Sequence, residues 1–199
     1  RSGEMDSTLL AFWWGALLAA MVARERPRAL WWCAVLVGLA GLVGLYLVWL
    51  GGAIILVLGV AAIVSAFAYT GGPWPYGYHG LGEVFVFVFF GLVAVAGTTY
   101  LQTLTWEPLA FAAAIPVGAL ITAILVINNL RDIETDAKTG KRTLAVMLGE
   151  RGAMAEYDLL IGVAYVVPVA LVIAGDVTWA ALLPLASLPL TVALFRVVH

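Results

Sequence analysis

Long apolar runs separated by short polar connections make up most of this chain. A bilayer core of about 30 Å requires about 20 helical residues, at about 1.5 Å of rise each. The stretches that meet or nearly meet this length are Ser7–Ala23, Leu30–Leu50, Ala53–Tyr69, Glu83–Tyr100, Pro108–Ile127, Tyr157–Ala174 and Val177–Val198. The pattern therefore predicts an all-α fold, a polytopic transmembrane helix bundle with about seven spans. The first stretch is the weakest candidate and could instead lie in the membrane interface, because Trp13 and Trp14 stand at its centre.

The composition agrees with this pattern. The 199 residues are 64% hydrophobic and 11% charged, with a formal net charge of −2. These values are typical of a membrane protein, and the small net charge indicates no nucleic-acid partner. We expect one transmembrane domain over residues 1–199, in the lipid bilayer of the inner or plasma membrane. The single cysteine, Cys33, excludes an internal disulfide.

The basic residues predict the orientation of the chain. Alternate connections on one side hold Arg24, Arg26, Arg28, Arg131, Lys138, Lys141, Arg142, Arg151 and Arg196. The opposite connections, at 51–52, 101–107 and 175–176, hold no lysine or arginine. Because cytoplasmic connections carry the excess of Lys and Arg, we expect the connection after Pro108–Ile127 to face the cytoplasm.

That connection, Asn128 to Thr143, is the most strongly ionic run of the chain. If the preceding helix continues through it, Asn128, Asp132 and Asp136 lie on one face, since they recur every four residues. Mg²⁺ commonly takes one or two protein carboxylates and completes its shell with water and phosphate oxygens. The spacing therefore favours a Mg²⁺ site for a phosphorylated substrate over a solvated loop whose charges only orient the protein.

A second informative connection, Tyr69 to Glu83, is rich in Gly and Pro and contains three tyrosines, a tryptophan and a histidine. The charge pattern places it on the same side as the aspartate run. Its composition fits a ligand-binding loop and an interfacial anchoring loop equally well. His79 and Glu83 are four residues apart across two glycines, so a metal site from this pair is a minor alternative. Glu83 fits better in the first turn of the next helix.

The charged residues after the aspartate run have a simpler interpretation. Glu150, Arg151, Glu156 and Asp158 flank the next span, and we interpret them as solvated charges at the membrane surface. Thr143 to Gly149 has the pattern of a short interfacial helix.

Two long motifs resemble those of the UbiA-type membrane prenyltransferases. Asp132 and Asp136 match the second aspartate motif of that superfamily, D-x-x-x-D. The wider string N-N-x-R-D-x-x-T-D-x-x-x-G-K-x-T-L from Asn128 onward resembles one branch, the 1,4-dihydroxy-2-naphthoate polyprenyltransferases. The second match is Y-T-G-G-P-x-P-x-x-Y-H-G-L-G-E at Tyr69 to Glu83, and the resemblance runs from about Leu30 to the end.

The resemblance implies a bundle of nine helices with two aspartate motifs on the cytoplasmic side, which hold Mg²⁺ and a polyprenyl diphosphate. The implied activity is transfer of the polyprenyl group to 1,4-dihydroxy-2-naphthoate with loss of CO₂, which gives a demethylmenaquinone-type product. Metal and basic groups would stabilise the departing diphosphate, and aromatic rings would shelter an allylic cation.

The resemblance also implies roles for individual residues. Asp132 and Asp136, with Asn128 beside them, would hold Mg²⁺, and Lys141, Arg131 and Arg142 would hold the diphosphate. Tyr69 corresponds to a tyrosine near the reacting carbon. His79 and Glu83 would lie near the aromatic acceptor.

One motif of the resembled family is absent. Its first aspartate motif, N-D-x-x-D, belongs upstream of residue 30. There Glu4 and Asp6 are the only acids before Arg24, and they do not have the spacing of the motif. Residues 1–29 therefore form an atypical region in its place, and we expect this chain alone to be inactive as a transferase.

Two alternatives remain open. A prenyltransferase could use another acceptor, such as 4-hydroxybenzoate or homogentisate. A noncatalytic binding or transport protein would instead use buried carboxylates for ions, although ionisable groups are almost absent from the predicted spans.

Overall fold

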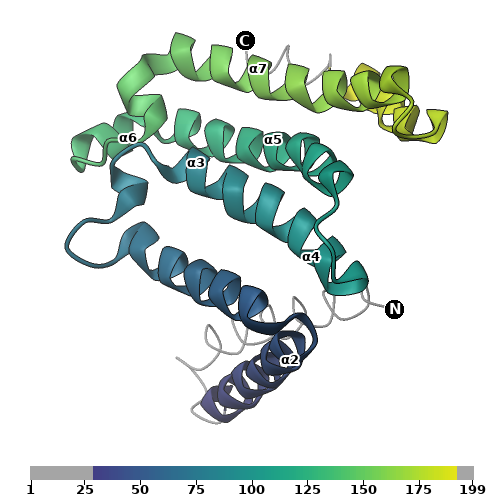
Figure 1. Ribbon diagram of the computed structural model, residues 1–199. Helices are drawn as coiled ribbons and strands as arrows, with labels where there is room; N and C mark the ends of the chain where they lie inside the picture. The colour runs from purple at the N-terminus through teal and green to yellow at the C-terminus, as the bar shows by residue number, and fades with distance from the viewer. Residues whose placement is uncertain (1–28, 192–199) are drawn as a thin grey trace. The chain divides into compact units, whose positions relative to one another are not determined.

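The computed structural model describes residues 29–191, and all of the regular structure in this part is helical (Figure 1). The elements are α2 (Ala29–Thr70), η1 (Tyr76–Tyr78), α3 (Gly82–Val86), η2 (Phe87–Val93), α4 (Ala94–Thr103), α5 (Pro108–Arg131), α6 (Ile133–Lys138), α7 (Leu144–Ala174) and η3 (Trp179–Ser187). Elements η1 and η3 are 3₁₀ helices, and η2 is a π-helical segment that joins α3 to α4.

Four helices in the described part are long and apolar enough to cross a membrane: Trp31–Thr70, Gly82–Thr103, Pro108–Arg131 and Leu144–Ala174. The chain is therefore an integral, multi-pass membrane protein, and the predicted all-α class is confirmed. The count of seven spans is not shown. The predicted span Ser7–Ala23 lies outside the described residues, and Val177–Val198 begins as the 3₁₀ helix η3.

Two glycines interrupt the long helices α2 and α7. Gly52 has φ 70° and ψ −158° and divides α2 between the predicted stretches Leu30–Leu50 and Ala53–Tyr69. Gly149 has φ 72° and ψ 172° and separates the first residues of α7 from the remainder. Because only glycine adopts positive φ at little cost, both breaks are encoded locally. The second break confirms the short helix expected at Thr143 to Gly149.

The contacts of the chain fall into two compact units, and each is described by itself. In the described part, the first unit comprises residues 29–60 with 100–104, and the second comprises residues 61–99 with 105–191. Within the first unit the Tyr100 hydroxyl donates to the Gly51 carbonyl oxygen over 3.4 Å. All of the candidate site residues belong to the second unit.

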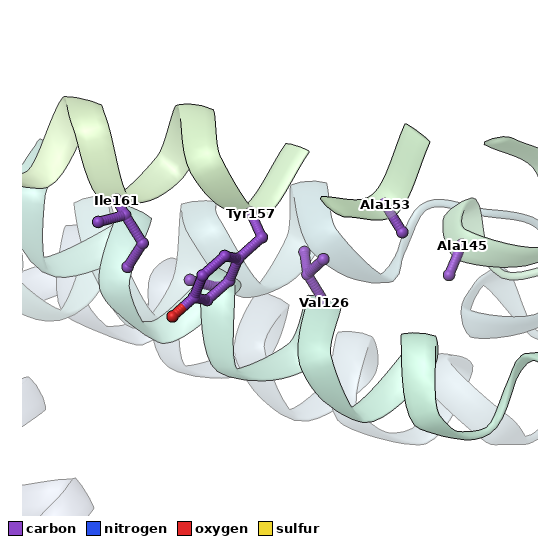
Figure 2. Close-up of a cluster of buried hydrophobic side chains, with 6 residues drawn as sticks. Val126, Ala145, Ala153, Tyr157 and Ile161 are labelled. Atoms are coloured by element: carbon purple, nitrogen blue, oxygen red, sulfur yellow. The ribbon is translucent and has the colours of Figure 1, made fainter. Parts of the chain in front are cut away.

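In the second unit α5 packs against α7 along one side and against η2 along another (Figure 1). Figure 2 shows the α5–α7 interface, where Val126 of α5 faces Ala153 and Tyr157 of α7. On the other side, a Cβ atom at Gly91 would lie 2.6 Å from the Gly118 Cα. The small residues thus let two helix backbones approach closely. At Gly97, by contrast, no atom of the described residues lies within 4 Å of the Cβ position.

Candidate functional site

The aspartate run adopts two helices rather than one. Helix α5 ends at Arg131, Asp132 has φ −96° and ψ 8°, and α6 begins at Ile133. The expectation of one uninterrupted helix is therefore wrong at Asp132. The spacing of four residues nevertheless survives, because Asp132 N donates to the Asn128 oxygen (3.1 Å) and Asp136 N donates to the Asp132 oxygen (2.8 Å).

The two aspartates pair with different cations. Arg131 donates to both carboxylate oxygens of Asp132, over 2.8 and 2.9 Å, and the pair lies at the surface. These hydrogen bonds hold the pKa of the Asp132 carboxyl below its usual value. Asp136 accepts from Lys141 over 3.0 Å in a pair whose side chains are only 13% and 23% exposed. The second pair is therefore the more shielded from water, and charge interactions there are stronger.

The Tyr69–Glu83 loop packs against the segment that follows the aspartates. The Arg142 backbone N–H donates to the Tyr78 carbonyl oxygen over 3.0 Å, and Lys141 Nζ lies 5.8 Å from the centre of the Tyr78 ring. A Cβ atom at Gly80 would lie 2.9 Å from the Met147 sulfur. The two motifs identified in the sequence therefore form one continuous surface.

A buried hydrogen bond joins the two motifs a second time. Asn129 Nδ2 donates to Glu83 Oε1 over 2.7 Å, and the two residues are 6% and 4% exposed. Glu83 lies in the first turn of α3, as predicted, and Asn129 lies near the end of α5. The adjacent Asn128, the predicted metal ligand, is exposed instead.

Aromatic rings continue from this loop into the helix that follows it. Tyr69 meets Tyr76 edge-on with ring centres 5.4 Å apart, and Tyr76 stacks on Phe85 at 3.9 Å. Phe85 in turn stacks on Phe89, which lies within the π-helical segment, at a centre-to-centre distance of 6.1 Å. Burial raises the pKa of the Tyr76 hydroxyl. The result is a row of π faces beside the buried carboxylate of Glu83.

The remaining predicted residues occupy distinct places. Tyr69, at the end of α2, lies beside Gly82, whose Cβ position is 3.6 Å from the Tyr69 hydroxyl oxygen. His79 is exposed, stacks on Trp74 at 4.4 Å and donates through Nδ1 to the Pro75 oxygen over 2.9 Å. The structure therefore gives His79 and Glu83 different surroundings. The Arg142 side chain is exposed.

Three residues of the site carry structural roles that the sequence did not assign. Asn129 is the buried partner of Glu83, although it stood in the quoted motif. Tyr76 is the buried centre of the aromatic row. Glu156, which we interpreted as a solvated charge, has a buried Oε2 atom with no hydrogen-bond partner in the described part of the chain. The only available signal for Glu156 was its helical spacing from Ala153, which contacts α5.

The carboxylates of Asp132 and Asp136 could supply some of the ligands of a Mg²⁺ site. Asp132 and Asp136 present carboxylates from adjacent turns, each beside a cationic side chain. Over residues 29–191, no group of three or more His, Cys, Asp and Glu residues could hold a metal by itself. Mg²⁺ does not require such a group, because water and phosphate oxygens commonly complete its shell.

Comparison with known proteins identifies relatives over most of the chain. The sequence pattern described as the UbiA prenyltransferase family matches residues 21–199. No solved structure matches the chain.

Several curated relatives are named 1,4-dihydroxy-2-naphthoate octaprenyltransferase. The one from Haemophilus influenzae is 47% identical over 133 residues, which cover 67% of this chain and 43% of the relative. The one from Mycobacterium tuberculosis is 47% identical over 136 residues, 68% of this chain and 47% of the relative. The one from Mycobacterium leprae is 42% identical over 175 residues, 87% of this chain and 58% of the relative. The chain thus spans about half the length of these relatives.

Proposed function

Because the chain belongs to the UbiA prenyltransferase family, we propose that the protein transfers a polyprenyl group from a polyprenyl diphosphate to 1,4-dihydroxy-2-naphthoate. The observation that supports this most directly is the union of the two motifs, in which the Arg142 N–H bonds the Tyr78 oxygen and Asn129 bonds Glu83. A donor site and an acceptor site must adjoin in a transferase, since the bond that breaks and the bond that forms share one carbon atom.

In this proposal the aspartates and the basic residues form the donor site. Asp132 and Asp136, with Asn128, hold Mg²⁺, which when bound stabilises negative charge on the diphosphate oxygens. Lys141 and, from the surface, Arg131 and Arg142 hold the diphosphate itself. Lys141 also positions Asp136, because the two side chains form a largely buried pair.

The reaction exchanges two bonds at the aromatic acceptor. The donor carbon–oxygen bond breaks, and its electron pair leaves with the diphosphate. The ring carbon that carries the carboxylate forms the new carbon–carbon bond, and CO₂ leaves while its bonding electrons return to the ring. Tyr69 and the rings stacked behind it face the developing allylic cation with their π electrons, and an apolar surrounding keeps water away.

The orientation follows from the basic residues. We place the aspartate end of α5 at the cytoplasmic surface, where both substrates' charged groups remain in water until they bind. Their apolar parts then extend along the helices in the membrane.

The test is a transfer assay in membranes that contain the full-length protein, with 1,4-dihydroxy-2-naphthoate, a polyprenyl diphosphate and Mg²⁺. Asp132→Asn and Asp136→Asn should each lower turnover by about 100-fold or more, because each removes charge that stabilises the transition state. Glu134→Gln is the matched control, since Glu134 lies in the same run and pairs with Lys138 at the exposed surface.

Retained turnover in both aspartate variants would overturn the role of the aspartates. Product from 4-hydroxybenzoate or homogentisate, with none from the naphthoate, would overturn the choice of acceptor. Unchanged diphosphate binding with and without Mg²⁺, and no product, would favour a noncatalytic membrane protein.

A further inference from the structure

Two buried carboxyl oxygens near the joined motifs lack hydrogen-bond partners within the described residues. They are Glu83 Oε2 in α3 and Glu156 Oε2 in α7. Glu83 is only 4% exposed, and Asn129 occupies its other oxygen. A buried oxygen left without a donor costs free energy, so a partner supplied by a ligand would relieve that cost.

The two oxygens belong to one locality. Glu83 bonds Asn129 of α5. Val126, about one turn earlier on that helix, packs in one cluster with Ala153 and Tyr157, which flank Glu156 on α7. Tyr69 adjoins the same place, because Gly82 beside Glu83 faces its ring. A ligand that reaches Glu83 from the aromatic row can therefore meet both carboxyl groups.

The chemistry of the pair selects the kind of ligand. A phenolic hydroxyl suits the pair, because it donates one hydrogen bond and accepts another. One of two neighbouring carboxyl groups readily carries a proton, because two like charges repel each other. The protonated group can donate the hydrogen bond that the ligand hydroxyl accepts.

We propose that Glu156, together with Glu83, binds the hydroxyl of the aromatic acceptor that lies furthest from the acceptor's carboxylate. This rests on the proposed function, because it takes a dihydroxynaphthoate as the ligand. The hydroxyl adjacent to the ligand carboxylate is satisfied internally by that carboxylate, so the hydroxyl at position 4 is the free donor. The ligand carboxylate then points away from Glu83 and Glu156, since like charges in a dry site repel.

The experiment compares the binding of two ligands by the full-length protein in lipid nanodiscs, followed by naphthoate fluorescence. The ligands are 1,4-dihydroxy-2-naphthoate, kept reduced, and 1-hydroxy-2-naphthoate, which lacks the hydroxyl in question. Wild-type protein should prefer the dihydroxy ligand by about tenfold or more, because one buried oxygen gains or loses its partner.

Variants of Glu156 test whether the preference for the dihydroxy ligand depends on this side chain. Glu156→Met keeps the length of the side chain but removes its polar atoms, so the preference should fall to near one while binding of the monohydroxy ligand stays unchanged. Glu156→Gln should retain the preference, because an amide both donates and accepts. Glu150→Gln is the control on the same helix, where the side chain is exposed.

If Glu156→Met still prefers the dihydroxy ligand as strongly as the wild-type protein does, the proposal is overturned. Glu83 Oε2 and Glu156 Oε2 would then be expected to share a proton with each other. If Glu156→Met fails to fold, wild-type protein with 4-methoxy-1-hydroxy-2-naphthoate gives the same test, since the methyl ether cannot donate. Equal binding of the ether and the diol would then overturn the proposal. Product formation by wild-type protein is measured separately, so absence of transfer with a retained preference counts only against the proposed function.

Discussion

Asn129 and Glu83, which lie 46 residues apart in the sequence, meet in a buried hydrogen bond of 2.7 Å. This bond ties the end of α5 to the start of α3, and it fixes the aspartate run relative to the aromatic loop. Asn128, one residue earlier, is exposed. Adjacent asparagines in one motif therefore have different structural roles.

We expect Asn129→Ala to lower the free energy of unfolding by about 1–3 kcal/mol, because it leaves a second Glu83 oxygen without a donor. Asn128→Ala should leave stability unchanged and instead weaken Mg²⁺ dependence. Denaturation in detergent, with Mg²⁺ titrations of activity, separates the two effects. Equal losses of stability in both variants would contradict this division of roles.

Lys141→Gln should weaken binding of the polyprenyl diphosphate by about tenfold or more, because it removes a charge held in the partly buried pair with Asp136. Lys138→Gln is the matched control, since Lys138 forms a 3.6 Å pair with Glu134 at the exposed surface. The affinity of each variant is measured by equilibrium binding of a labelled polyprenyl diphosphate to protein in nanodiscs. Similar affinities in the two variants would remove Lys141 from the donor site.

Gly77→Ala should disturb the loop, because its Cβ position lies only 2.7 Å from the Tyr69 backbone oxygen. Backbone cannot move aside as a flexible side chain can, so we expect a loss of about 1–3 kcal/mol. Gly82→Ala should be tolerated, since the nearest atom, Tyr69 Cε2, is at an ordinary 3.5 Å. Thermal unfolding of the two variants tests this difference, and a tolerant Gly77 would show that the loop can shift without cost.

Gly91→Ala should destabilise the contact between η2 and α5 by about 1–3 kcal/mol, because the added methyl group would meet the Gly118 backbone. Gly97→Ala in the same span should be neutral or stabilise by up to about 1 kcal/mol, because alanine favours helix and no atom of the described residues stands within 4 Å. The two variants are compared by their unfolding midpoints in mixed detergent. Matched midpoints would indicate that the helices separate easily at Gly91.

Much of this fold was predictable because hydrophobic runs and glycine breaks are local signals. The stretches ending at Leu50 and beginning at Ala53 are divided in the structure at Gly52. The side of each helix that becomes buried was not predictable, because the spans are apolar on every face and carry little amphipathic pattern. Asn129 rather than Asn128 is buried for this reason, since the choice depends on where α3 packs.

For the site, the motifs predicted a set of candidate residues whose roles stay predictions. The structure brings Tyr78 and Arg142 together, as the shared side of their two connections suggested. The environment of Glu156 was not predictable, because it directly precedes the predicted span Tyr157–Ala174, and a glutamate at such a position is usually solvated. Its burial depends on the packing of α7 against α5, which no local pattern encodes.

The buried bond between Asn129 and Glu83 also affects how the chain is made. Glu83 is synthesised 46 residues before its partner, a delay of several seconds at about 5–20 residues per second. During that interval the carboxylate has no amide to bond, so the span Gly82–Thr103 gains by keeping its first turn in water while its remainder enters the membrane. Arrival of α5 then completes the burial of Glu83, and the order of synthesis determines when the two motifs can first unite.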